Sequence, residues 1–426
     1  MFKQFGNGKL VAGIDINDSF FQLSYCMTNS ENVETVSSVA GAEVYSIPTV
    51  LCKRSGVNQW YYGNEAIRYA GENDNILIDN LLSLAISGET VRIEEEDFEP
   101  EALLALFLKR SMGALSKAVP DRLEALMITC EKLDYRVIEV LNQVVGRLDL
   151  KTDKVFYQSH MESFYAYMLR QPEDLWLAKT LLLDYRDNRI VVYQMECNRR
   201  TRPMVVFIGE EERAFPAYEP MPGEEELRAE KYARLDAALL ELVQEALHNQ
   251  VVSAVYLIGE DFREEWMKET LRFLCKGRRV FQGNNLYSKG ACYGMLERIQ
   301  ESEAGKEHVF LGKDKLKANI GMNVLRRGEA SYYALLDAGE NWFEAEKTLE
   351  LYIQKDSCLE FIITSLVGRG NAVARVTLEE LAGEVSRLRL HLYLQDENSL
   401  MVEITDLGFG TFRASQGKVW KDKIAL

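Results

Sequence analysis

The chain has 426 residues and a mass of 48.7 kDa, which is too long for one ordinary domain and predicts about two to four separate cores. Hydrophobic residues make up 47% and charged residues 27%, a composition typical of folded globular proteins and not of disordered chains. The formal net charge of -16 argues against binding to nucleic acid or to an anionic membrane. We therefore expect a protein or peptide partner, no nucleic acid and no membrane.

The N-terminal segment has no apolar run after its lysines, so no secretion signal is expected. The seven cysteines are odd in number and widely spaced, which predicts reduced thiols and a cytoplasmic location. The four histidines have no second histidine or cysteine at metal-ligand spacing, so no metal site is expected. Ser159, His160 and Glu162 are neighbours at a predicted helix start and would rarely face one another, so we predict no hydrolase chemistry.

The first half of the chain reads as a meander of short strands followed by alternating helices and strands. Short β patterns cover residues 11–27 and 44–51. Apolar stripes and short buried runs then predict, in order, a helix at 101–118, a strand at 125–129, a helix at 135–148, a strand at 154–157 and a helix at 162–170.

The second half repeats this order. It reads as strands at 180–184, 189–195 and 204–208, a helix at 232–248, a strand at 254–258 and a helix at 262–275. Asp187 and Asn188 have the character of an ordinary hairpin turn between the first two of these strands. The repeated order predicts an internal structural duplication, although the residues themselves are not repeated.

The remainder of the chain has a different pattern. All eight prolines lie at or before Pro222, and a polar stretch at 300–307 then precedes short alternating strands at 349–353, 359–364, 388–394 and 400–405. This pattern predicts a C-terminal β-sandwich. The expected domains are a first lobe at 1–172, a shortened second lobe at 173–300, a linker at 301–318 and the β-sandwich at 319–426.

Several short motifs, taken in order, resemble the seventy-kilodalton heat-shock chaperones of the actin-like ATPase superfamily. They are GIDINDS at 13–19, SIPTV at 46–50, GNEA at 63–66, LLLD at 181–184, VYLIG at 255–259, VFLG at 309–312 and ITDLGFG at 404–410. Each motif alone is weak, but their order is fairly specific, and the resemblance covers nearly the whole chain. It implies an α/β fold with two duplicated ribonuclease-H-like lobes, followed by a β-sandwich similar to the substrate-binding domain of the chaperones.

The resemblance also implies a nucleotide site between the lobes. Its vestigial members would be Asp15, Asn17, Ser19, Asp184, Arg186, Arg189 and Gly259. The two aspartates match positions that hold magnesium-bound water in the family. ATP or ADP with magnesium is therefore the cofactor that the resemblance suggests, although none is expected to be required.

The departures from the family pattern predict weak or absent catalysis. Neither phosphate loop has the glycines that let backbone N–H groups approach phosphate, and Asp18 would repel an anion. The catalytic lysine of the family falls on Ile67 and its catalytic glutamate on Ser159. Glu260 follows Gly259 where the family has a second glycine. We therefore expect no catalytic residue here.

Other interpretations of these residues stay open. The aspartates could be turn formers, since aspartate favours turns, and the arginines could form a substitute anion site or be solvated hairpin tips. The acidic run at 94–97 could precede a helix or dock a partner. Aromatic residues of the C-terminal part could line a peptide groove or belong to the core; these are Tyr332, Tyr333, Phe343 and Tyr352.

The leading hypothesis is a chaperone-like pseudo-ATPase that acts as a protein-interaction module without efficient ATP hydrolysis. The alternative is a nucleotide-switched ATPase chaperone with an altered phosphate site. A small-molecule kinase is disfavoured because such enzymes need glycine-rich phosphate loops and a catalytic aspartate, for which the sequence offers no candidate.

Overall fold

The computed structural model describes residues 8–30, 32–39, 41–72, 74–119, 122–186, 188–220, 225–259, 261–263, 265–354, 358–366, 370–381 and 384–426. The chain divides into two compact units, Met1–Val309 and Phe310–Leu426, and each is described by itself. Three residues named in the sequence analysis lie outside the described residues, namely Asp187, Pro222 and Glu260.

The first sheet of unit 1 has the strand order β11-β10-β1-β2-β3, with β4 paired to β2. β1 is antiparallel to β2 and parallel to β10, and β10 is parallel to β11. Its strands are β1 (Leu10–Ile16), β2 (Phe20–Met27), β3 (Glu34–Thr35), β4 (Ile47–Pro48), β10 (Leu123–Cys130) and β11 (Val155–Ser159). Three helices alternate with the parallel strands, α3 (Pro100–Ala118), α4 (Tyr135–Gly146) and α5 (His160–Met168).

The second sheet has the order β16-β15-β12-β13-β14-β17, in which the first five strands pair in the same order and directions as those of the first sheet. Its strands are β12 (Lys179–Arg186), β13 (Arg189–Asn198), β14 (Met204–Ala214), β15 (Val252–Ile258), β16 (Arg279–Gly283) and β17 (His308–Phe310). The accompanying helices are α6 (Glu225–Ala246), α7 (Lys268–Leu274) and α8 (Leu286–Ile299). A short 3-10 helix, η1 (Glu173–Leu175), precedes this sheet.

Smaller elements extend the first half of unit 1. They are β5 (Leu51–Lys53), β6 (Trp60–Tyr62), β7 (Ile76–Ile78), α1 (Gly63–Ala70), α2 (Leu81–Ser87), β8 (Val91–Ile93) and β9 (Glu96–Phe98). The acidic run forms the β8–β9 hairpin, where Glu94 binds the buried Lys53 ammonium at 2.7 Å. Part of this run therefore has a structural partner within the chain.

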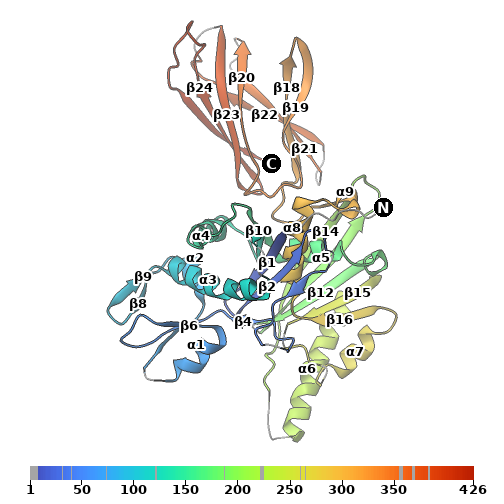
Figure 1. The fold of residues 1–426 in the computed structure, drawn as a ribbon. Coiled ribbons are helices and arrows are strands. Elements are labelled where there is room, and N and C mark those ends of the chain that lie inside the picture. The colour runs from blue at the N-terminus through green and yellow to red at the C-terminus, as the bar shows by residue number, and fades with distance from the viewer. Residues whose placement is uncertain are drawn as a thin grey trace, which may run out of the picture. The chain divides into compact units, whose positions relative to one another are not determined.

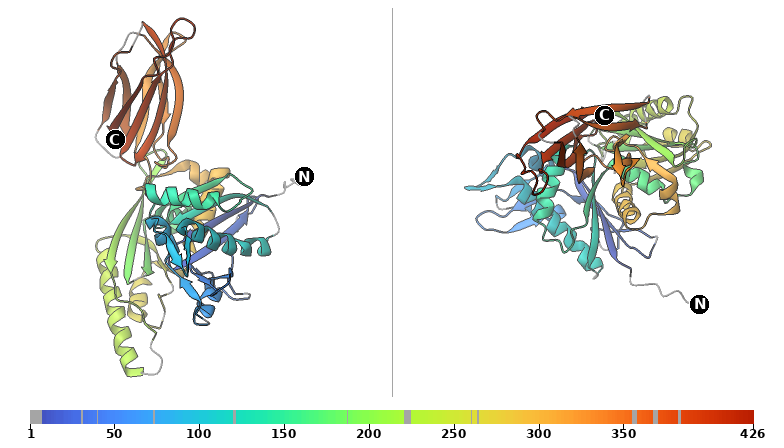
Figure 2. Two further views of the ribbon diagram at one scale, coloured as in Figure 1. Left: turned by 90° about the vertical axis from the view of Figure 1, so that its left-hand side faces the viewer. Right: turned by 90° about the horizontal axis from the view of Figure 1, so that it is seen from above.

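The central strands are mostly apolar because helices cover both faces of each sheet. Every residue of β1 is buried. On the second sheet, Leu239 and Val243 of α6 pack with Leu183 and Val255 of the strands in one core, and α6 runs along the side of the sheet (Figure 2). The expected mixture of helices and sheets is confirmed, since the described residues form several sheets with helices between their strands (Figure 1).

Two elements of the second half were not predicted from the sequence, β16 and α8. The helix expected at 262–275 is present only as α7. α8 was not predicted because its own residues are buried on most sides of the helix. It therefore lacks the one-sided apolar stripe that marks a surface helix. Within the expected linker, residues 303–307 form α9 (Glu303–Glu307) and residues 308–310 form β17.

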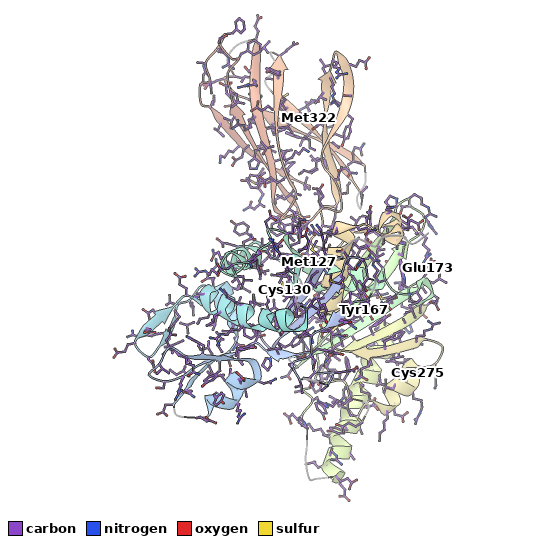
Figure 3. The ribbon with its side chains drawn as sticks, viewed as in Figure 1. Met127, Cys130, Tyr167, Glu173, Cys275 and Met322 are labelled. Atoms are coloured by element: carbon purple, nitrogen blue, oxygen red, sulfur yellow. The ribbon has the colours of Figure 1, made fainter. Side chains whose placement is uncertain are left out.

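α8 packs closely against β1, β10 and α5, and these elements lie side by side in Figure 1. A Cβ atom on Gly290 of α8 would lie 2.0 Å from the Ser163 carbonyl oxygen of α5, and one on Gly13 of β1 would lie 2.3 Å from the Cys292 backbone nitrogen of α8. Met127 of β10, labelled in Figure 3, shares a buried cluster with Cys292. The absence of side chains at the two glycines is what lets the backbones approach.

Unit 2 consists of two antiparallel four-stranded sheets, ordered β19-β18-β21-β22 and β20-β23-β24-β25. Inward residues of both sheets, among them Phe361 and Leu390, form one buried core. The strands are β18 (Ala318–Arg326), β19 (Glu329–Leu336), β20 (Glu346–Gln354), β21 (Cys358–Ser365), β22 (Asn371–Thr377), β23 (Val385–Asp396), β24 (Ser399–Asp406) and β25 (Val419–Ala425). The C-terminal run of antiparallel strands is thus present as expected.

Among the described residues, no helix combines the length and the apolar character needed to cross a membrane. All seven cysteines are free thiols. Cys26 and Cys292 lie within 3.4 Å of each other between their sulfur atoms, and burial raises the pKa of the Cys292 thiol well above its usual value. A high thiol pKa disfavours the reactive thiolate.

We predict that Gly290→Ala destabilises unit 1 by about 1–3 kcal/mol, because the added methyl group would overlap the Ser163 carbonyl. Gly113→Ala on α3 is the matched control, since no neighbouring atom lies within 4 Å of the added Cβ and alanine favours a helix. Urea unfolding followed by circular dichroism measures both. Equal stability of Gly290→Ala and the wild type would contradict the close α5–α8 packing.

Candidate functional site

Two buried aspartates occupy matching places in the two sheets of unit 1. Asp15 of β1 pairs in register with Thr129 of β10, and Asp184 of β12 pairs with Ile258 of β15. Their exposed fractions are 1% and 3%. Buried carboxylates need hydrogen-bonding partners, so their contacts decide what this region can do.

A chain of contacts connects the two carboxylates. His160 Nε2 donates a hydrogen bond to Asp15 Oδ1 at 2.8 Å, and the Tyr287 hydroxyl donates one to Asp184 Oδ2 at 2.9 Å. The rings of His160 and Tyr287 stack with centroids 3.8 Å apart and an interplanar angle of 9°. We call Asp15, His160, Tyr287 and Asp184 the aspartate bridge, because these four residues link the first strands of the two sheets.

The positions of the two rings follow from the helices that carry them. His160 is the first residue of α5 and Tyr287 lies in the first turn of α8, and each helix follows an edge strand of its own sheet, β11 for α5 and β16 for α8. The Ser159 hydroxyl caps α5 by accepting from the Glu162 N–H at 3.4 Å. Close packing of α5 on α8 therefore brings the two rings into contact.

Arg186 neutralises one end of the aspartate bridge. Its Nε donates to Asp184 Oδ1 at 2.8 Å and its Nη2 contacts Asp184 Oδ2. The guanidinium carbon lies 5.3 Å from the Phe20 ring centroid and 5.6 Å from that of Tyr287. Burial alone would lower the pKa of Arg186, but the carboxylate of Asp184 outweighs it and raises the pKa above its usual value. Asp184 thus has a permanent cationic partner within the chain.

In the first hairpin loop, backbone N–H groups donate hydrogen bonds to a side chain of the same loop. Asn17 Oδ1 accepts the N–H groups of Ser19 at 2.9 Å and Phe20 at 2.8 Å, as an Asx turn does. Asp18 accepts the Ser83 N–H at 2.9 Å and also contacts the Ser83 hydroxyl. These loop groups, which the resemblance assigns to phosphate binding, already have partners inside the protein.

The second hairpin is joined to the first half of unit 1 by an ion pair. Arg186 at the end of β12 and Arg189 at the start of β13 pair in register, and Asn188 has a φ of 61°. Arg189 donates from Nη1 and Nη2 to the two oxygens of Glu131 at 2.9 and 2.6 Å, and its Nη1 lies 3.2 Å from Glu212 Oε2. Glu131 follows β10, so this bidentate contact connects the two sheets.

The remaining positions from the family pattern are also described. Gly259 has a φ of 120°, and a Cβ atom there would lie 2.2 Å from the Tyr185 carbonyl oxygen, so the fold itself requires this glycine. Ile67 is exposed on α1. Ser19 is exposed at the hairpin loop.

Some side-chain nitrogen atoms at this site have no hydrogen-bond partner among the described residues. They are buried nitrogen atoms, namely Arg186 Nη1, Asn17 Nδ2 and His160 Nδ1. Within the described part of the chain, no group of three His, Cys, Asp or Glu side chains is placed to hold a metal ion.

The four aromatic residues expected at a peptide groove do not share one surface in unit 2. Tyr332 is 50% exposed on β19 and its ring covers Gly321 on the outward side of the first sheet. Tyr352 is 64% exposed on β20 of the second sheet. Tyr333 lies on β19 beside Met322, and Phe343 packs partly buried against the core beside Trp342.

A family described as "Family of unknown function (DUF5716) C-terminal" matches residues 32–313, about two thirds of the chain. The chain belongs to this family. A second match, "Domain of unknown function (DUF8552)", covers residues 315–426. The DUF5716 and DUF8552 matches meet close to the division between the two units at Val309. No curated protein matches the chain.

Asp184 lies within the DUF5716 match and Asp15 precedes it, and the chaperone resemblance stays a hypothesis. Sequence reasoning named Asp15, Asp184, Arg186 and Arg189 but set His160 aside and missed Tyr287. The sequence signal that could have found His160 and Tyr287 was their position, since each lies where a helix begins after a strand. Glu131 was also missed, since no local pattern marks the partner of Arg189.

We predict that Arg186→Met destabilises unit 1 by about 3–5 kcal/mol, because it leaves the buried Asp184 carboxylate without its cation. Adding Asp184→Asn should recover much of this loss, because the remaining group is then neutral. Chemical unfolding of the two single variants and the double variant measures the coupling. Strictly additive effects would contradict a buried pair.

We predict that Arg189→Gln lowers stability by about 1 kcal/mol at neutral pH and that this difference shrinks progressively below about pH 4. Burial alone would raise the pKa of Glu131, but Arg189 outweighs it and lowers the pKa in the folded chain. The stabilisation is therefore present above the unfolded pKa and is lost as pH falls through the folded pKa.

The measurement is the stability of both proteins between pH 3 and pH 7. Arg234→Gln is the control, because its ion pair with Glu230 lies within one helix and is exposed. A stability difference that persists unchanged at low pH would rule out the Glu131 carboxylate as the cause.

Proposed function

We propose that this protein is a chaperone-like pseudo-ATPase that acts as a protein-interaction module without efficient ATP hydrolysis. The observation that carries the proposal is the pairing of Asp184 with Arg186 inside the chain. A carboxylate that already has a guanidinium partner and a tyrosine hydroxyl has little reason to bind a hydrated magnesium ion. The proposed site is thus closed by the protein's own residues.

The other half of the proposed phosphate site supports the same interpretation. The Asn17 side chain takes the two backbone N–H groups of the first loop. Asp15 accepts from His160. Catalysis would also need groups at positions 67 and 159, where an exposed isoleucine and a helix-capping serine stand. Losing one positioned acid or base typically costs about 100- to 10,000-fold in rate.

We infer further that the two halves of unit 1 are duplicated ribonuclease-H-like lobes and that unit 2 is a β-sandwich of the substrate-binding type. The shared strand order of the two six-stranded sheets supports the first inference. The common core of the two antiparallel sheets supports the second. On this view the fold of a nucleotide-driven chaperone is kept while its switch is replaced by fixed contacts.

A specific observation favours the alternative, a nucleotide-switched ATPase chaperone with an altered phosphate site. Arg186 Nη1 and Asn17 Nδ2 are buried donors without partners among the described residues. Donors of this kind bind anions well, and arginine binds phosphate in particular. Binding would then require part of the aspartate bridge to open.

We predict that ATP and ADP cause no magnesium-dependent rise in melting temperature at millimolar concentration. A ligand about 100-fold above its dissociation constant would stabilise the fold by about 2.7 kcal/mol, which a thermal shift assay detects readily. Asp15→Asn is the matched variant, since it removes the charge at the proposed magnesium position. A magnesium-dependent shift in the wild type that this variant loses would support the nucleotide-switched alternative instead.

A further inference from the structure

The loop between β24 and β25 of unit 2 presents an aromatic side chain almost completely to solvent. Phe412 is 87% exposed, and its ring lies 5.8 Å from that of Phe409. The Phe409 ring in turn meets the Tyr352 ring edge-on at 6.1 Å. We call Tyr352, Phe409 and Phe412 the aromatic cluster.

The loop that carries this cluster is built around a buried carboxylate. Asp406 is 1% exposed and accepts the Gly408 N–H at 3.0 Å and the Gln416 N–H at 2.9 Å. Arg413 donates to both Asp406 oxygens at 2.8 and 3.2 Å and to the Ser386 hydroxyl at 2.8 Å. Burial alone would raise the pKa of Asp406, but these hydrogen bonds outweigh it and lower the pKa.

The backbone of the loop is fixed as well. Phe409 N–H donates to the Arg413 carbonyl at 2.7 Å, and Phe412 N–H donates to the Phe409 carbonyl at 3.1 Å. Gly408 has a φ of 75°, and a Cβ atom there would lie 2.4 Å from the Arg413 carbonyl oxygen. A loop held in this way presents Phe412 in one position, which reduces the entropy that a binding partner would otherwise lose.

A partly exposed arginine stands beside the cluster. Arg387 is the register neighbour of Tyr352 across β20 and β23 and is 40% exposed. Its Nε is buried and has no hydrogen-bond partner among the described residues, and the Glu350 carboxylate lies 3.9 Å from it. Glu350 is shared with Arg389, at 3.2 Å. Arg387 and Arg389 thus share one carboxylate, and Arg387 is the arginine that stands next to Tyr352.

We propose that the aromatic cluster and Arg387 bind a segment of a protein partner in which an apolar side chain stands next to a carboxylate. Exposed aromatic anchors with a neighbouring arginine are the residues that dominate the energy of protein interfaces. The apolar side chain would cover Phe412 and the carboxylate would pair with Arg387. The overall charge of -16 disfavours a second copy of this chain or an anionic lipid surface as the occupant.

This inference rests on the proposed function, because it names the kind of partner that the interaction module would bind. Its site is separate from the aspartate bridge, so the two can fail separately. A magnesium-dependent nucleotide shift would overturn the proposed function and leave the peptide measurements below unchanged.

The test begins with selection of random twelve-residue peptides, displayed on phage, against the full chain. Peptides recovered on the wild type but not on Phe412→Ser are synthesised, and their affinities are measured by fluorescence polarisation. We expect the enriched peptides to carry an aromatic or aliphatic residue beside Asp or Glu. Phe412→Ser and Arg387→Gln should each weaken binding about tenfold or more. The control is Tyr332→Ser, which removes a half-exposed aromatic ring on β19, outside the aromatic cluster. It should leave affinity unchanged.

The charge contact has its own test in a double-mutant cycle. Changing the acidic residue of the peptide to its amide should weaken binding to the wild type but not further weaken binding to Arg387→Gln. Melting temperatures of the variants serve as the folding control, since Phe412 and Arg387 contribute exposed side chains.

Several results would overturn the inference. They are enrichment of basic peptides, failure to enrich any peptide above the Phe412→Ser background, or affinities that ignore both substitutions. Self-association in sedimentation velocity that Phe412→Ser abolishes would identify a second copy as the occupant. Binding to phosphatidylcholine vesicles that the same substitution abolishes would identify a lipid surface instead.

Discussion

The arrangement of unit 1 depends on the close contact between α5 and α8. Gly290 lets α8 lie against the Ser163 carbonyl, and Gly13 lets β1 approach the backbone of the same helix. Because α5 follows β11 of the first sheet and α8 follows β16 of the second, this contact joins the two halves. It also sets the first turns of the helices together, so that His160 and Tyr287 stack. The geometry of the aspartate bridge therefore follows from the close packing of α8, which glycine at positions 13 and 290 permits.

The electrostatic state of the bridge follows from its burial. Two carboxylates in a poorly solvated interior need donors, and His160, Tyr287 and Arg186 supply them. Unit 2 uses the same principle at Asp406, where a strand-end aspartate is held by Arg413 and backbone N–H groups. The two sites differ in what these contacts achieve. In unit 1 they occupy the buried aspartates with partners from the chain itself. In unit 2 they fix a loop on which Phe412 is exposed.

Hydrophobic periodicity predicted the central helices and strands of unit 1 correctly. The helices α3, α4 and α6, and the buried strands β1, β10, β12 and β15, have local patterns that do not depend on distant contacts. The pattern did not predict the smaller elements α1, α2 and β6–β9, four strands of unit 2 (β18, β19, β22 and β25), or α8 and β16. α8 is covered on most sides, so apolar and small residues surround its axis and no stripe distinguishes it. β16 is mostly exposed at the edge of its sheet and carries little apolar alternation.

The sequence by itself determined the repeated order of strands and helices, the two strand-end aspartates and the absence of glycine from both hairpin loops, because these are properties of local segments. Only the tertiary structure decided the partners of those residues. His160 lies 145 positions from Asp15, and Tyr287 lies 103 positions from Asp184. Contacts across such separations are fixed by how α5 and α8 pack, which no local pattern encodes. For the same reason Arg186 could be a phosphate ligand on sequence grounds, whereas in the folded chain it binds Asp184.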